Sequence, residues 1–286
     1  MKKYAFFVIL LSILPLFAKE SMSDFENQLL EKTLQQELLT RSCDSNESAI
    51  QMLDDYILEI ESPEIQNQLS DEVRLIIDNL LVLSKYTYLY NIDMNSESAK
   101  ELIMKQYEKV VEWNESHTDD LNKWYVVSYG DLINSCMRFL PQTQAIKLGL
   151  QEKKDYDALV EKYPEMSVAC MNSALWYYFA PGIGGGSQKK AGELFNQAYS
   201  CASNDYEKYY SAVYLSQYYF NTDKSKCSEY LQAAENVLPG TSYINFIKML
   251  NSKGYSVLDY SNNREKIDKK LGLRIVSRKN LTEIVL

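Results

Sequence analysis

The sequence is poor in the residues that most often carry metal binding and catalysis. It contains a single histidine, His117, and five cysteines that form no Cys-x-x-Cys pair. The usual spacing of zinc ligands is therefore absent, and a catalytic histidine would need a partner that the sequence does not position. His117 lies in a polar turn before Asp119 and Asp120, which fit the start of a helix, where the dipole favours acidic residues. We therefore predict a non-enzymatic protein without a cofactor or a metal.

Glycine and proline are also scarce, at ten and six residues. The only dense glycine run lies at residues 182–186, and a Gly-rich loop that leads into a helix can bind phosphate. The Gly-Lys-Ser/Thr ending of a phosphate loop is missing, because Ser187 precedes Lys189 and nothing strand-like precedes the loop. We interpret the run as a widened turn in which Ser187 caps the next helix. Gly184 and Gly185 remain candidate contacts for a partner.

Long apolar runs are absent after the first 18 residues, so we predict no transmembrane segment in the mature chain. Residues 1–18 combine two early lysines, an apolar run at 5–13 and a small residue, Ala18, which is the layout of a secretory signal peptide. Leu16 is large for its position, so an uncleaved anchor is the alternative. We expect an exported protein of the periplasm or cell envelope.

Basic residues are outnumbered by acidic ones, 30 to 39. An acidic body argues against nucleic-acid binding, which requires neutralisation of phosphates. Residues 261–286 are the exception, with seven basic and three acidic residues. This basic C-terminal tail could dock on the acidic body, contact a partner or remain solvated.

Nearly every segment after residue 24 has the apolar periodicity of a helix, with prolines at the joints between segments. The Ser-rich stretches 45–48 and 95–98 are typical of helix caps. The expected helices are 24–39, one after each of these two caps, 70–90, 119–140, 142–163, 167–179, 187–202, 205–220, 224–238 and a closing helix at 241–251. Strand-like alternation occurs only at 273–278 and 282–286, where we expect a small β-hairpin. The sequence thus predicts an all-α fold.

Two blocks repeat at an interval of 36 residues. Ala191, Leu194, Phe195 and Ala198 align with Cys227, Tyr230, Leu231 and Ala234, and each block follows a Tyr-rich segment. A two-helix repeat of this length is the sign of a solenoid. Small residues let the two helices of a unit approach each other, and the bulky residue fills the groove to the next unit.

The second block, Cys227-x3-Leu231-x2-Ala234-x4-Pro239, resembles the second-helix signature of tetratricopeptide repeats. The resemblance is good over 172–203 and 208–239 and weaker before that. Departures are Phe179 and Leu215, which stand where the first helix of a repeat normally has a small residue. The resemblance implies an α-solenoid of antiparallel helix pairs over 19–260 that binds protein segments on its concave face. The Gly-rich insertion is similar to bacterial exported members, some of which associate with transporters or envelope-assembly machinery.

The cysteines permit a disulfide in an exported chain, although an odd number leaves at least one thiol free. Cys170 and Cys201 lie on the two helices of one unit and are the pair to test. Cys227 occupies a small-residue position and fits a buried apolar role.

Tyrosine is abundant, at 23 residues. Tyr210, Tyr214 and Tyr218 form one helical stripe, which we assign to packing between helices, whereas Tyr177, Tyr206 and Tyr219 point elsewhere and are expected to be exposed. Exposed tyrosine is enriched at recognition surfaces.

From these patterns we predict a Tyr-rich groove for a protein or peptide partner, formed by these three residues with Gly184 and Gly185. The alternative is a small-ligand-binding or accessory component of a periplasmic transport system. The first would act by shape and aromatic contact, with acidic side chains favouring a basic partner segment.

Overall fold

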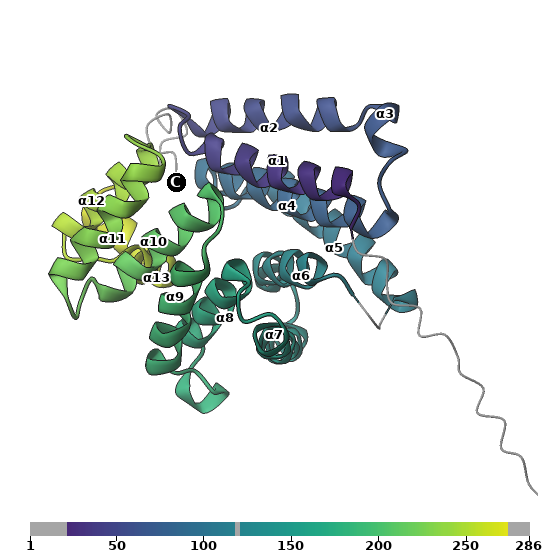
Figure 1. Cartoon of the computed structure of the whole chain (residues 1–286). Helices are drawn as coiled ribbons and strands as arrows, with labels where there is room; N and C mark the ends of the chain where they lie inside the picture. The colour runs from purple at the N-terminus through teal and green to yellow at the C-terminus, as the bar shows by residue number, and fades with distance from the viewer. Residues whose placement is uncertain (1–21, 118–120, 274–286) are drawn as a thin grey trace, which may run out of the picture.

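The computed structural model describes residues 22–117 and 121–273, and these residues form an all-helical fold (Figure 1). The expected signal peptide and the residues of the expected hairpin from 274 onward lie outside the described residues. The α-helices are α1 (Asp24–Thr40), α2 (Asn46–Ile60), α3 (Pro63–Gln66), α4 (Asp71–Ile92), α5 (Glu97–Ser116), α6 (Lys123–Cys136), α7 (Gln142–Lys162), α8 (Ser167–Phe179), α9 (Gln188–Cys201), α10 (Asp205–Tyr219), α11 (Lys224–Val237), α12 (Ser242–Ser252) and α13 (Val257–Leu271). Two short 3₁₀ turns are η1 (Met137–Phe139) and η2 (Gly182–Gly184).

The predicted helix caps are confirmed. Ser45, Ser96 and Ser187 each stand at an N-cap and accept a hydrogen bond from the backbone N–H three residues later. Such a bond satisfies one of the amide groups that the first turn leaves without a partner. Local side-chain chemistry therefore fixes where α2, α5 and α9 begin.

The end of the chain differs from expectation, because α12 does not close the fold. Helix α13 follows it and continues to Leu271, across the start of the predicted basic tail. Its polar sequence has little apolar periodicity, but the Tyr260 hydroxyl donates to Asp268 Oδ1 at 2.7 Å and the Tyr260 ring meets Phe246 of α12 edge-on. Tertiary contacts thus stabilise a helix that its own pattern does not predict.

The two predicted repeat units are helix pairs that pack along their lengths, α8 with α9 and α10 with α11, and α9 in turn packs against α10. Ala191 and Cys227, at the predicted small positions, are buried. The ring of Tyr214 stacks on Phe195 across the junction between the pairs, with ring centroids 6.3 Å apart. These contacts confirm packed helix pairs in this part of the chain.

The N-terminal helices pack against the C-terminal ones. In Figure 1, α1, α2 and α4 (purple to blue) lie on one side, and α9 to α12 (green to yellow) lie on the other. Helix α1 contacts α10, and Arg41 Nε at its end donates to the Tyr210 hydroxyl at 2.8 Å. From α13, Arg264 reaches back to the side-chain oxygen of Asn91 in α4. The N-terminal helices are therefore held to the C-terminal ones by contacts between residues far apart in the sequence.

No helix among residues 22–117 and 121–273 combines the length and the apolar character needed to cross a membrane. All five cysteines are free thiols, including Cys170 and Cys201. Both of these thiols donate instead to the carbonyl of Pro164, at 3.6 and 3.8 Å.

Candidate binding cavity

A cavity of about 960 Å³ lies at the centre of the fold, between α1, α4, α6, α7, α8 and α10. We call it the central cavity. Its lining is mainly apolar, with the acidic side chains on α1, α6 and α7 and the aromatic side chains on α4, α8 and α10. The lining includes Glu37 on α1 and Arg41 directly after it, Asp131 and Asn134 on α6, Ile146, Leu150 and Glu152 on α7, Asn172, Trp176 and Phe179 on α8, Ile183 and Gly184 in η2, and Tyr206, Tyr210 and Tyr214 on α10.

One edge of the central cavity is an exposed apolar rim formed by α7, the end of α8 and η2. Seven large apolar side chains are exposed among the described residues, and four of them line this cavity: Ile146, Leu150, Phe179 and Ile183. Ile183 is fully exposed, at 103%. Scattered single apolar side chains are normal on a surface, but a cluster beside a cavity marks a site of interaction.

Three carboxyl groups lie on the wall of the central cavity, and we call them the acidic cluster: Glu37, Asp131 and Glu152. Asp131 accepts hydrogen bonds on Oδ1 from Asn172 at 2.8 Å and from the Tyr156 hydroxyl at 3.4 Å. Glu152 accepts one on Oε1 from Asn134, whereas its Oε2 has no hydrogen-bond partner among the described residues. Buried carboxylate oxygens are normally satisfied, so this one needs an explanation.

The surroundings of the acidic cluster disfavour the charged state of each member. Burial raises the pKa of Glu37 to about 7 and the pKa of Asp131 to about 7. Burial, together with the nearby Asp131 carboxylate, raises the pKa of Glu152 to about 8. Perturbed groups of this kind in a cavity are typical of functional sites.

Among the described residues, Arg41 is the only basic one that lines the central cavity. Its guanidinium lies over the rings of Tyr88, Tyr210 and Tyr243, with 4.8 Å to the centroid of Tyr243. It lowers the pKa of Glu37 but makes no ion pair within 4 Å to an acidic side chain of residues 22–117 or 121–273. These aromatic and hydroxyl contacts hold the cation on the α1 and α10 side, where it cannot neutralise all three acids.

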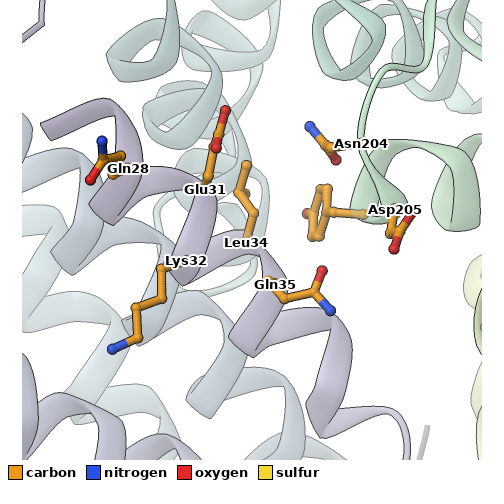
Figure 2. Close-up of a pocket in the computed structure, with 8 residues that line it drawn as sticks. Gln28, Glu31, Lys32, Leu34, Gln35, Asn204 and Asp205 are labelled. Atoms are coloured by element: carbon orange, nitrogen blue, oxygen red, sulfur yellow. The ribbon is translucent and has the colours of Figure 1, made fainter. Parts of the chain in front are cut away.

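A second, smaller cavity of about 510 Å³ lies on the other side of α1, where that helix faces the start of α10. Figure 2 shows Glu31, Leu34 and Gln35 of α1 on one side and Asn204 and Asp205 on the other. Its side chains are mostly exposed polar groups. Tyr206 lines both cavities, and its hydroxyl donates to Glu37 Oε1 at 3.4 Å.

The structure brings only two of the predicted partner residues to the central cavity, Tyr206 and Gly184. Tyr177 is 5% exposed, so its predicted exposure is wrong, and its hydroxyl donates to Asp157 at 2.7 Å. Tyr219 is half-buried and stacks on Tyr230 outside the cavity. Gly185 neighbours the cavity but does not line it. The hydrogen bond to Asp157 explains why Tyr177 can be buried, because a buried phenol hydroxyl needs an acceptor.

The Gly-rich insertion is a turn and Ser187 caps the next helix, as predicted, although backbone hydrogen bonds make the turn tight instead of widened. The backbone N–H groups of Gly184 and Gly186 donate to the carbonyl of Pro181, and that of Ser187 donates to Tyr177. Gly185 takes a positive φ of 98°, which glycine adopts without strain. A Cβ at Gly186 would lie 1.8 Å from the Ala180 oxygen. The amides thus close the turn, and the turn places Ile183 in solvent.

His117 stacks on Trp113 at 3.7 Å between ring centroids, and its Nδ1 lies 3.0 Å from the Trp113 carbonyl oxygen. Asp119 and Asp120 lie outside the described residues. Within the described residues, no group of three or more His, Cys, Asp or Glu side chains is arranged to hold a metal ion.

The acidic cluster was not predicted from the sequence. Asp131 alone carried a signal, because it is the only acidic residue in α6 and follows the apolar stretch of that helix. Glu37 and Glu152 lie among other polar residues, so nothing in the local pattern distinguishes them.

No protein-family model and no curated protein matches this chain.

Proposed function

We propose that this protein is an exported, tetratricopeptide-like α-solenoid that binds a peptide segment of a protein partner in the central cavity. The observation that carries the proposal is the apolar rim beside the cavity. Four of the seven exposed large apolar side chains of the described residues meet there, although they come from α7, α8 and η2. Such clustering is costly in water and is relieved when a partner covers it.

The lining of the central cavity suits recognition of a peptide. Trp176, Tyr206 and Tyr214 offer aromatic surface with little conformational entropy to lose, and tyrosine hydroxyls can bond a peptide backbone. Arg41 and Asn134 add further polar contacts. An apolar cavity with a few convergent polar groups is the usual form of a binding site.

The packed pairs α8/α9 and α10/α11 support the solenoid interpretation. Phe179 and Leu215 depart from the repeat signature in different ways. Leu215 is fully buried, but Phe179 is 38% exposed and lines the cavity. The departure at Phe179 thus adds apolar surface to the site instead of filling the core.

A small-ligand-binding component of a transport system is the second candidate. A volume of about 960 Å³ falls within the range of small-molecule sites. Native mass spectrometry of the purified protein distinguishes the two, because a small ligand retained in the cavity appears as a defined added mass.

The proposal is tested by selecting peptides from a random phage-displayed library on the purified protein and measuring their affinity by calorimetry. The variant Ile146→Ser/Phe179→Ser removes two rim side chains that are 57% and 38% exposed. We expect roughly 10- to 100-fold weaker binding, because a partner covers only the exposed part of each of the two side chains, and that part contributes about 0.7–1.4 kcal/mol.

The control is Leu58→Ser on α2, whose side chain is 70% exposed and lies away from the central cavity. It should leave the affinity unchanged. If the selected peptides bind the rim variant and the control equally well, or if no peptide is selected, the central cavity is not a peptide site.

A further inference from the structure

The acidic cluster is not explained by the stability of the fold. Its three carboxyl groups stand on α1, α6 and α7, and none forms an ion pair with a lysine or arginine of the described residues. Asp131 is close enough to raise the pKa of both Glu37 and Glu152. Carboxyl groups gathered on one cavity wall oppose each other's ionisation, and Arg41 acts on Glu37 alone, so Asp131 and Glu152 suit a cationic group of a ligand.

Glu152 gives an independent indication. Its side chain is 2% exposed and lines the central cavity, yet Oε2 has no hydrogen-bond partner among the described residues. On the neighbouring Asp131, both hydrogen bonds from the protein fall on Oδ1 and neither falls on Oδ2. Each acid therefore keeps an acceptor oxygen that the described residues do not use.

Arg41, the cation of the cavity lining, donates no hydrogen bond to these oxygens of Asp131 and Glu152 among the described contacts. Arg41 donates to the Tyr210 hydroxyl and lies over three tyrosine rings on the α1 and α10 side. Asp131 and Glu152 stand on α6 and α7, beside the apolar rim. Asp131, Glu152 and the apolar rim thus line the same cavity.

We propose that a lysine or arginine side chain of the bound peptide donates hydrogen bonds to Asp131 and Glu152, while the apolar neighbours of that side chain cover the rim. This assignment rests on the proposed function, since it names the chemistry of the same ligand. Lysine and arginine carry an apolar stem and a cationic head, which matches a rim of isoleucine, leucine and phenylalanine beside two carboxyl groups.

Binding of the cation should require loss of protons from the acidic cluster. The charged groups that surround Asp131 and Glu152 are Glu37 on α1, Arg41 directly after α1 and Asp155 on α7. The hydroxyls of Tyr156 and Tyr206 also lie near the cluster. Glu152, with a pKa of about 8, is mostly protonated at pH 6 and must release its proton to solvent before it can pair with the cation. Affinity should therefore rise roughly 10- to 100-fold from about pH 6 to about pH 8.5, where a lysine side chain stays charged.

The experiment uses the peptides selected for the central cavity. We expect a lysine or arginine at one position, and replacing it by norleucine or citrulline should weaken binding to the wild-type protein roughly 10- to 100-fold. In Asp131→Asn and Glu152→Gln, tested separately, the same replacement should change affinity less than about 3-fold. The matched control is Glu161→Gln, an exposed residue of the same helix as Glu152, which should behave as the wild type.

The wild-type protein gives a second test that needs no variant, the pH dependence of affinity for the charged peptide and its neutral analogue. A steep dependence for the charged peptide alone supports the assignment. Peptides that lose affinity in the rim variant but carry no basic residue, or whose neutral analogue shows the same pH dependence, would overturn it and leave the proposed function standing. Selected peptides that bind the rim variant with the same affinity as the wild type would refute the proposed function itself.

Discussion

The variant Glu152→Gln should stabilise the ligand-free protein at about pH 8 and leave its stability near pH 5 unchanged. The side chain is 2% exposed, and burial raises the pKa of the folded-state carboxyl to about 8 from an ordinary value near 4.5. A pKa raised by folding contributes stability below the unfolded pKa, and that contribution is lost as the pH rises through the folded value. Glutamine keeps the shape of the protonated acid and has no proton to lose.

The size of this effect follows from the shift in pKa. At 1.36 kcal/mol per unit, a rise from 4.5 to about 8 makes the penalty for ionising Glu152 about 5 kcal/mol as an upper limit, and about 2 kcal/mol once solvent entering through the open cavity is allowed for. In a chain of this length, about 2 kcal/mol corresponds to a rise in Tm of about 4–8 °C.

The assay is thermal unfolding followed by circular dichroism at about pH 5 and pH 8 for the wild type, Glu152→Gln and the control Glu161→Gln. The wild type should lose stability between the two pH values, and Glu152→Gln should lose less. A parallel loss in all three proteins, or a destabilised Glu152→Gln at about pH 8, would refute the reasoning, because the carboxylate would then be no cost to the fold.

Three further predictions concern packing, an ion pair and the thiols. Gly130→Ala should destabilise the protein by about 1–3 kcal/mol in urea denaturation, since its Cβ would lie 2.2 Å from the hydroxyl of the buried Tyr156. The control is Gly149→Ala, whose Cβ would have no contact closer than 3.7 Å and which should be neutral or slightly stabilising. Asp157→Asn should cost about 1 kcal/mol at pH 7. Hydrogen bonds from Lys153, Tyr177 and Lys190 outweigh burial and lower the pKa of Asp157, so its contribution exists above the unfolded pKa and is lost as the pH falls through the lower folded value. The difference in stability from the wild type should therefore shrink as the pH falls below about 4. Ellman's reagent should label Cys201 first in the native protein, since the other four thiols are buried. Unfolding without reductant should make all five thiols reactive. An unlabelled Cys201, or fewer than five reactive thiols after unfolding, would contradict the structure.

The sequence predicted the helices well where capping and apolar periodicity agree. The bounds of α8, 167–179, match, and the caps of α2, α5 and α9 are the expected serines. It failed for α13, which has three lysines near its end and a non-helical residue, Asn263, in its interior. That helix depends on contacts with α12 and α4, which local patterns do not report.

The central cavity was beyond sequence reasoning for a related reason. Its walls come from six helices, and the contact that closes it, Arg41 with Tyr210, joins residues 169 positions apart. Tyr210 and Tyr214 were assigned to packing, and they do pack, yet they also line the cavity. Tyrosine count predicted an aromatic surface, but not which tyrosines compose it.

Site-specific photo-crosslinking tests the central claim most directly. Benzoylphenylalanine placed at Ile183, which is fully exposed at the cavity rim, is compared with the same probe at Leu58 on α2. With a selected peptide added, we predict an adduct at Ile183 that excess unlabelled peptide abolishes, and none at Leu58. Equal crosslinking at the two positions, or crosslinking only at Leu58, would contradict binding in the central cavity.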